Sequence, residues 1–210
     1  MDYLQKTIAA YDGSPDKFAS ATNDLVNLQE IDSLISYMPD GNLKVLDVGC
    51  AFGRDCRVFA DRGLKVTGID MSLELLNRAR KLHPNVELLQ MDVRNLEFND
   101  DSFAAVWCSA VLLHLNDADL AIAFKELRRI LMPGGAIAVS FKLGEGEQTF
   151  VENFSAEQAR YYNFKTEEML KTLMSDNGFT IEKVYVMNNR KRFGSTRRDL
   201  DWVWAFAKRV

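Results

Sequence analysis

The sequence predicts an α/β fold: one doubly wound sheet of about seven strands, mostly parallel, with helices on both faces. Two observations support this prediction. Between residues 43 and 142, apolar runs of strand length alternate with helical patterns, which is typical of βαβ units with right-handed crossovers. Near the end of the chain, a basic turn joins two alternating segments, which predicts an antiparallel C-terminal strand that closes the sheet.

The composition is that of a globular protein. The chain has 210 residues, of which 47% are hydrophobic and 27% charged. A domain of this size buries roughly 70% of the surface of its unfolded chain, so we expect a single domain over residues 1–210. The formal net charge of −4 argues against a general binder of nucleic acid or of membrane surfaces, because such proteins need a net basic field.

The cysteines, histidines and apolar runs predict a cytoplasmic protein with reduced thiols and no metal site. The three cysteines are odd in number and form no C-x-x-C pair. The two histidines, His83 and His114, stand at no ligand-like spacing from them. The first ten residues contain no sustained apolar core, and no run of about 18 apolar residues indicates a membrane span.

The first two segments of the predicted domain are a cap and a core. Residues 1–40 form a predicted N-terminal helical cap of two pieces, separated by the turn Asp12-Gly13-Ser14-Pro15. Residues 43–142 form the predicted cofactor-binding core. Its predicted strands are Leu43–Val48, Lys65–Ile69, Val86–Met91, Phe103–Cys108 and Ala136–Phe141, and its predicted helices are Arg54–Asp61, Leu73–Leu82 and Asp119–Leu131.

Residues 143–210 are the predicted acceptor-side and sheet-closing segment. A polar loop and an irregular aromatic and charged stretch run to Phe164. A helix is predicted over Thr166–Asp176, with Thr166 as its N-cap. The two closing strands are predicted over Thr180–Met187 and Asp201–Ala207.

A glycine loop follows the first predicted strand. Glycine lets the backbone approach a ligand closely, and the helix that follows offers free N–H groups. The dinucleotide fingerprint G-x-G-x-x-G would need glycines at positions 49, 51 and 54, but the chain has Ala51 and Arg54. This spacing disfavours a nicotinamide oxidoreductase.

The loop Asp47-Val48-Gly49-Cys50-Ala51-Phe52-Gly53 resembles the first motif of class I S-adenosylmethionine-dependent methyltransferases, an acid followed by G-x-G-x-G. Ala51 replaces the middle glycine. Acids at the next two strand ends, Asp70 and Asp92, and the turn Pro133-Gly134-Gly135 extend the resemblance from about Leu43 to Phe141. It implies a Rossmann-like fold, S-adenosyl-L-methionine as cofactor and S-adenosyl-L-homocysteine as product.

The resemblance also implies residue roles. Asp70 accepts hydrogen bonds from the ribose hydroxyls, while the Asp92 side chain and the Val93 N–H match the donor–acceptor edge of adenine. The alternatives are that Asp70 caps the helix beginning near Ser72 and that Asp92 is a solvated turn residue. The predicted cofactor-binding residues are Tyr11, Asp47, Gly49, Cys50, Ala51, Gly53, Arg54, Asp70, Met71, Asp92, Val93, Ser109 and Leu113.

Two of these residues have two interpretations each. Arg54 either pairs with the methionine carboxylate of the cofactor or is a solvated first-turn arginine. Tyr11 lies in an N-terminal segment that folds over the cofactor in related enzymes. Its side chain either forms a hydrogen bond to the methionine end of the cofactor or has only a packing role.

The predicted acceptor side follows the fourth strand and continues in the C-terminal third. His114 is the predicted catalytic residue, able to deprotonate an acceptor oxygen or nitrogen, and the alternative is a structural histidine at a helix start. His114, Arg160, Tyr161 and Tyr162 are the predicted substrate-binding residues. The last three either clamp a carboxylate-bearing or aromatic substrate or pack a lid over the sheet.

The predicted function is therefore transfer of a methyl group to an O or N atom of a small-molecule acceptor, by in-line displacement. A general base is optional in such a reaction, because the donor is already activated. The alternatives are a tRNA or protein methyltransferase, or a non-catalytic S-adenosylmethionine-binding protein. We expect a monomer or homodimer.

Overall fold

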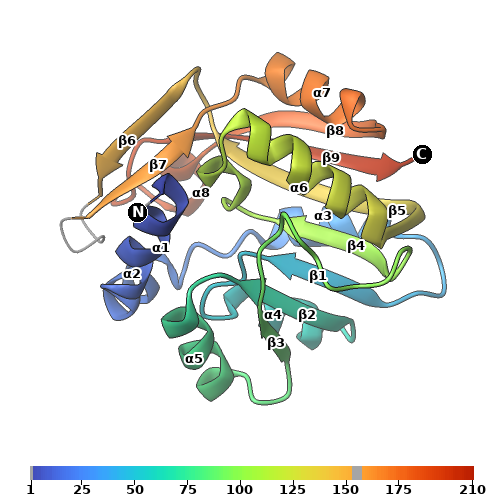
Figure 1. The fold of residues 1–210 in the computed structure, drawn as a ribbon, viewed down its shortest axis with the longest axis horizontal. Helices are drawn as coiled ribbons and strands as arrows, with labels where there is room; N and C mark the ends of the chain where they lie inside the picture. The colour runs from blue at the N-terminus through green and yellow to red at the C-terminus, as the bar shows by residue number, and fades with distance from the viewer. Residues whose placement is uncertain (1, 153–157) are drawn as a thin grey trace.

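A seven-stranded sheet forms the centre of the computed structural model, which describes residues 2–152 and 158–210 (Figure 1). The strand order is β3-β2-β1-β4-β5-β9-β8. The strands are β1 (Lys44–Val48), β2 (Lys65–Asp70), β3 (Glu87–Gln90), β4 (Phe103–Cys108), β5 (Leu131–Lys142), β8 (Phe179–Asn188) and β9 (Asp201–Arg209).

The sheet is mostly parallel, as predicted. β1 pairs in parallel with β2 and β4, while β9 runs antiparallel to both β5 and β8. The chain enters at the centre, winds outward through β2 to β3, and then returns to β4 on the other side of β1. Such a reversal of strand order opens a crevice at the carboxyl ends of the two central strands, where open α/β sheets bind ligands.

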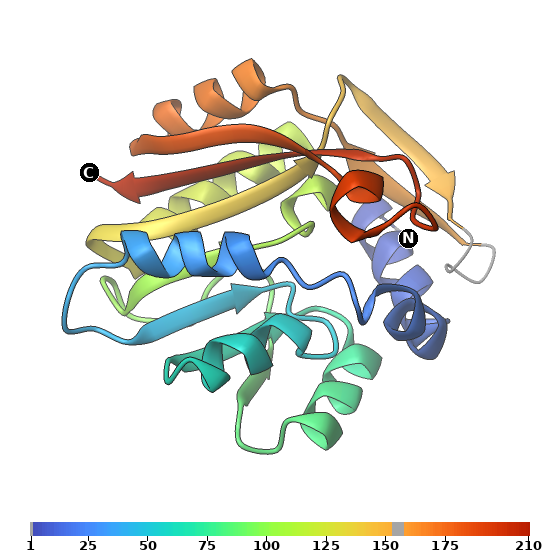
Figure 2. The ribbon, with the colours of Figure 1, turned by 180° about the vertical axis from the view of Figure 1, so that it is seen from behind.

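Helices cover both faces of the sheet, in two separate apolar layers. Figure 1 shows α6 and α7 in front of the strands, and Figure 2 shows α3 and α4 on the opposite face. One core cluster joins α6 and α7 to the sheet, and the other joins α3, α4 and α5 to it. The helices are α3 (Leu28–Tyr37), α4 (Arg54–Asp61), α5 (Leu73–Leu82), α6 (Asp117–Ile130), α7 (Glu167–Asp176) and the short α8 (Asn189–Phe193).

The N-terminal cap has three helices where the sequence predicted two pieces. α1 (Tyr3–Asp12) and α2 (Pro15–Thr22) flank the predicted turn, but the second piece breaks after Thr22 before α3 begins. The break contains Asn23, Asp24 and Asn27, which are poor formers of helix interiors. α1 and α2 therefore lie at the carboxyl end of the sheet, apart from α3 (Figure 1).

Three further segments differ from the prediction. The stretch predicted as irregular contains an antiparallel pair of strands, β6 (Glu147–Val151) and β7 (Ala159–Asn163). The Pro133-Gly134-Gly135 turn lies inside β5 as a bulge, because the strand pairing shifts between Phe103 and Ala105 of β4. α6 begins two residues before the predicted start because Asn116 is its N-cap and accepts from the Asp119 N–H at 2.8 Å.

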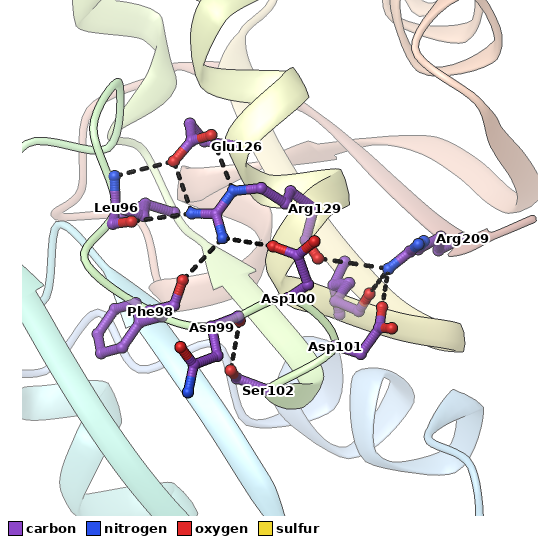
Figure 3. Close-up of polar contacts among 10 residues, drawn as sticks. Leu96, Phe98, Asn99, Asp100, Asp101, Ser102, Glu126, Arg129 and Arg209 are labelled. Carbon is purple, nitrogen blue, oxygen red and sulfur yellow. Dashed lines mark hydrogen bonds and ion pairs between the residues drawn. The ribbon is translucent and has the colours of Figure 1, made fainter.

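Arg129 on α6 connects this helix to the loop between β3 and β4 (Figure 3). Its guanidinium donates to the carbonyls of Leu96 and Phe98 at 2.8 and 2.7 Å, and it pairs with Glu126 and Asp100. Asp92, at the start of the same loop, lies on the cavity described below. The network therefore holds the loop that carries this acid.

We expect Arg129→Met to lower the free energy of unfolding by about 2 kcal/mol, because it leaves two carbonyls and two carboxylates without their shared donor. Urea denaturation measures the loss. The control is Arg128→Met, since Arg128 makes a single exposed bond to the Val210 carbonyl and should change stability by less than about 0.5 kcal/mol. Equal losses in the two variants would contradict the role assigned to Arg129.

Candidate functional site

A cavity of about 460 Å³ opens at the carboxyl ends of β1 and β4, where the strand order reverses. Its walls come from the loops after β1, β2, β3 and β4, from α1 and α2, and from the C-terminal third of the chain. It thus spans the predicted cofactor loop and the predicted acceptor side. The following predicted site residues line it: Tyr11, Asp47, Gly49, Cys50, Ala51, Arg54, Asp70, Met71, Asp92, Val93, Ser109, Leu113, His114, Arg160 and Tyr162.

Two predicted site residues do not line the cavity. Gly53 precedes α4 in the left-handed region, with φ +80°, and closes the glycine loop. The Tyr161 ring packs against the ring of Tyr3, with 4.7 Å between centroids. Tyr161 contributes to the site through its backbone carbonyl, which contacts His114.

The glycine loop takes its shape from three left-handed residues. Gly49, Ala51 and Gly53 have φ of +70°, +51° and +80°. A Cβ on Gly49 would lie 2.4 Å from Val111 Cγ2, so a larger residue does not fit there. The N–H groups of Gly49 and Cys50 both donate to the Ile69 carbonyl, at 2.8 and 3.0 Å, which joins the loop to the end of β2.

The Asp70 carboxylate lies between the glycine loop and α5. It accepts from the N–H groups of Ala51 at 2.9 Å and Ser72 at 2.8 Å. Burial raises its pKa to about 6, although these backbone N–H groups act in the opposite direction. The N-cap of α5 is Ser72 itself, whose side chain accepts from the Leu75 N–H, and Asp70 in turn holds the Ser72 N–H directly before the helix.

Asp92 and Val93 lie side by side on the cavity wall, at the end of β3. The Asp92 carboxylate pairs with Arg94 at 2.6 Å, and Arg94 also pairs with Asp119 at 3.1 Å. Asp92 is therefore anchored by an arginine and is not a freely solvated turn residue.

Arg54 is held by contacts within the protein. Its guanidinium makes a two-pronged pair with Asp55, at 2.8 and 3.0 Å, and donates to the Thr22 carbonyl at 2.9 Å. These contacts tie α4 to α2, so Arg54 is not a solvated arginine. Asp47 beside it is buried and accepts from the Cys56 thiol at 3.1 Å. Burial, together with the neighbouring Asp55, raises the Asp47 pKa well above its ordinary value.

His114 and Tyr11 meet across the cavity. His114 ends the short 3-10 helix η1 (Leu112–His114), and its Nδ1 lies 2.7 Å from the Tyr161 carbonyl oxygen. A carbonyl only accepts, so Nδ1 carries the proton and Nε2 is left as an acceptor. The Tyr11 hydroxyl, 2.9 Å from Nε2, is therefore the donor in that contact. Arg160 also donates to this oxygen, which leaves one lone pair for a ligand in the cavity.

This environment keeps His114 neutral. Burial lowers its pKa to about 3, and the cations Arg160 and Lys142 act in the same direction. We expect the His114 imidazole to show no NMR titration midpoint above pH 5. His83 is an internal control, because it is partly exposed and its pKa is lowered less far. His114→Gln assigns the two signals, and a His114 midpoint near 6.5 would contradict this arrangement.

A charged cluster that the sequence analysis did not single out lies beside Arg160 and Tyr162. Lys142 at the end of β5 forms an ion pair with Glu152, and Arg160 and Arg198 lie 3.2 and 2.9 Å from the same carboxylate. The sequence pattern does not predict this cluster, because its members lie far apart along the chain. Lys142 ends β5, Glu152 follows β6, Arg160 lies in β7 and Arg198 precedes β9.

The described part of the chain contains neither a metal-binding cluster nor a membrane-spanning helix. Among residues 2–152 and 158–210, no group of three or more His, Cys, Asp or Glu side chains is placed to hold a metal ion. None of the helices in these ranges is both long and apolar enough to cross a membrane.

Comparison with known sequences matches the core of the chain. The family model described as "Methyltransferase domain" matches residues 45–135. The demethylmenaquinone methyltransferase of Chlorobaculum tepidum is 43% identical over 93 residues, which are 44% of this chain and 38% of that protein. The malonyl-[acyl-carrier protein] O-methyltransferase of Pseudescherichia vulneris is 35% identical over 94 residues, 45% of this chain and 37% of that protein. The match thus spans about two fifths of these relatives.

Comparison with solved structures extends the likeness to most of the chain. An S-adenosylmethionine-dependent methyltransferase of Methanosarcina mazei has a TM-score of 0.73 and 22% identity, over 85% of this chain and 97% of the other. The 1,6-didemethyltoxoflavin-N1-methyltransferase of Burkholderia thailandensis, solved with bound 1,6-didemethyltoxoflavin and S-adenosylhomocysteine, has a TM-score of 0.69 and 18% identity, over 100% of this chain and 92% of the other. At these identities the likeness shows the fold.

Proposed function

We propose that this chain is a class I S-adenosylmethionine-dependent methyltransferase, and that it transfers the methyl group of S-adenosyl-L-methionine to a small-molecule acceptor. The observation that carries this proposal is one continuous cavity with two different ends. Asp70 and Asp92 line it on the β2 and β3 side, and Tyr11, His114 and Arg160 line its other walls. The two central strands, β1 and β4, lie between the β2–β3 side and β5.

The cofactor end fits the group that the family binds. In the proposal, the Asp70 carboxylate accepts from ribose hydroxyls, and the Asp92 carboxylate and Val93 N–H take the adenine edge. The left-handed glycine loop lets the backbone approach the ligand, and Gly49 leaves no room for a side chain. Arg54 acts indirectly, since it already pairs with Asp55 and holds α2 near the loop. Cys50, Met71, Ser109 and Leu113 complete the wall.

The bound cofactor would supply a methyl group on a positively charged sulfur. The chain's own residues position the acceptor and exclude water. α1 and α2 bring Tyr11 and Phe18 over the cavity, with their rings 5.0 Å apart. An acceptor atom can donate to the Tyr11 oxygen, whose own proton is held by His114 Nε2. This contact would orient a lone pair of the acceptor toward the methyl group, and orientation is the main requirement of a direct displacement.

The surroundings of His114 favour positioning over proton removal. A buried imidazole whose pKa falls to about 3 is a weak base at neutral pH. In the proposal His114 therefore acts through Tyr11, and an O or N acceptor that donates to the Tyr11 oxygen loses its proton after transfer.

We expect Tyr11→Phe to lower kcat about fivefold, because a misplaced acceptor loses part of the benefit of orientation. His114→Phe should lower kcat by a similar factor, since phenylalanine offers the Tyr11 hydroxyl no acceptor. If the two residues act as one unit, the double variant loses no more than either single variant. Steady-state kinetics with the acceptor identified below measures this, and additive losses would show that the two residues act separately.

The proposed function is tested with the purified protein. Isothermal titration calorimetry should show binding of S-adenosylmethionine and S-adenosylhomocysteine. A screen of small-molecule metabolites with radiolabelled methyl donor should then identify an acceptor. Failure of the wild-type protein to bind either nucleoside would overturn the proposal. Binding without transfer to any acceptor would support a non-catalytic S-adenosylmethionine-binding protein instead.

A further inference from the structure

The Asp92 carboxylate is bound by a residue two positions further along the chain. The backbone N–H of Arg94 donates to Oδ1 at 2.9 Å, and its Nε and Nη2 donate to Oδ2 at 3.0 and 2.6 Å. Nε is shared between the two oxygens, since it also lies 3.1 Å from Oδ1. A carboxylate has about four lone-pair sites. Three N–H groups of one residue therefore fill most of them and leave about one site for a ligand.

The remaining site faces the cavity. Asp92 lines the cavity, whereas Arg94 does not. The guanidinium thus approaches the carboxylate from the protein side and leaves the ligand side open. The terminal torsion of an aspartate is broad unless hydrogen-bond partners restrict it. The two-pronged contact removes this freedom, so Arg94 determines which lone pair Asp92 presents to a bound molecule.

Arg94 is held in turn by the first turn of α6. Its Nη1 pairs with Asp119 Oδ2 at 3.1 Å, so all three guanidinium nitrogens contact a carboxylate. The Tyr3 hydroxyl donates to the same oxygen of Asp119 and accepts from the Asn116 N–H at 3.2 Å. The orientation of the guanidinium is therefore fixed from both ends.

Tyr3 connects this network to the N-terminal cap. It is the first residue of α1, and its ring packs against the ring of Tyr161 at 4.7 Å. One turn further along α1, the Thr7 hydroxyl accepts from the Tyr161 N–H at 3.1 Å. The same helix carries Tyr11 to the cavity. A continuous row of contacts therefore runs from the end of β3, across α6, to the helix that covers the site.

We propose that Arg94 is a positioning residue for recognition of the nucleobase: it fixes Asp92 so that the remaining lone pair accepts from the amino group of adenine. The inference rests on the proposed function, since it concerns the base of the bound cofactor. Tyr3 supports this orientation through Asp119. A purine with an oxo group at that position would place a carbonyl against the carboxylate and a ring N–H against the Val93 N–H. Both hydrogen bonds would then be lost.

Calorimetry with two matched nucleosides tests this role. S-adenosylhomocysteine and S-inosylhomocysteine differ only in the base, where an oxo group and a ring N–H replace the amino group and the unprotonated ring nitrogen. We expect the wild-type protein to bind S-adenosylhomocysteine at least about a hundredfold more tightly. The ratio of the two dissociation constants is the informative quantity, because a displaced loop would weaken the binding of both nucleosides alike.

Three variants separate orientation of Asp92 from charge and from folding. Arg94→Met and Arg94→Lys should each lower the ratio about tenfold, because lysine keeps the charge but lacks the planar fork that holds both oxygens. Tyr3→Phe should lower the ratio about threefold, since it removes one hydrogen bond from Asp119. Arg80→Met is the control and should keep the wild-type ratio, because Arg80 donates to the Leu88 carbonyl of β3 but does not line the cavity. Thermal unfolding verifies that each variant is folded.

The inference and the proposed function fail in different ways. A wild-type protein that does not bind S-adenosylhomocysteine overturns the proposed function and this inference with it. Binding of S-adenosylhomocysteine with an unchanged ratio in Arg94→Met, or in Arg94→Lys alone, overturns the positioning role and leaves the proposed function standing. Equal affinities of the wild-type protein for the two nucleosides have the same consequence. An unchanged ratio in Tyr3→Phe overturns the part assigned to Tyr3.

Discussion

Replacing Asp70 by alanine should weaken the binding of S-adenosylmethionine about a hundredfold, or about 2.7 kcal/mol. In the proposed function this carboxylate accepts hydrogen bonds from the ribose, and hydrogen bonds to a charged group contribute about 1.5–3 kcal/mol each. The stability of the unliganded protein should fall by much less than this binding free energy. Burial makes the ionised carboxylate costly, as its pKa of about 6 indicates, so its removal offsets part of the lost bonds to Ala51 and Ser72.

Two measurements on the same variant separate binding from folding. Calorimetry gives the dissociation constant, and urea denaturation gives the stability of the unliganded protein. Asp61→Ala is the control, because Asp61 is exposed at the end of α4 and does not line the cavity. A variant that loses stability but keeps its affinity would show that Asp70 only shapes the loop.

Gly49→Ala should lower the free energy of unfolding by about 3 kcal/mol and abolish cofactor binding. Two physical effects add at this position. The left-handed backbone, with φ +70°, costs any residue with a Cβ about 1–2 kcal/mol. The new Cβ would also lie 2.4 Å from Cγ2 and 2.6 Å from Cβ of Val111, and relief of such overpacking typically costs about 1–3 kcal/mol.

Gly41→Ala isolates the first of these effects. Gly41 has φ +82°, but a Cβ there would meet nothing within 4 Å. This control should therefore lose only the backbone contribution, about 1 kcal/mol, and bind the cofactor normally. Urea denaturation of both variants gives the difference. Equal losses of unfolding free energy in the two variants would show that the close packing of the glycine loop against Val111 does not contribute to stability.

The cofactor half of the site could be predicted because its signal is local. Gly49 follows a strand directly, and Asp70 and Asp92 each close the next strand along the chain. Parallel strands bring their carboxyl ends to one edge, so residues far apart in the sequence meet once the strand pattern is known. All three line the cavity, and their roles toward the cofactor stay predictions.

The acceptor half could be predicted only in part. His114 and Arg160 were identified as candidates from their residue types, but their partners were not. Nothing in the sequence pairs Tyr11 with His114, 103 residues away, or fixes which imidazole nitrogen carries the proton. That choice depends on the Tyr161 carbonyl, a backbone group that no residue type reveals.

The alternation of strands and helices, the glycine loop and the acids at the strand ends could all be predicted from the order of residues. These features depend on local conformation and on the period of apolar residues, which can be read along the chain. The folded chain was needed to show that Arg54 pairs with Asp55 and that Lys142, Arg160 and Arg198 share one carboxylate. The physical reason is that burial and charge depend on every neighbour in space, and a cavity takes its neighbours from elements that the chain keeps far apart.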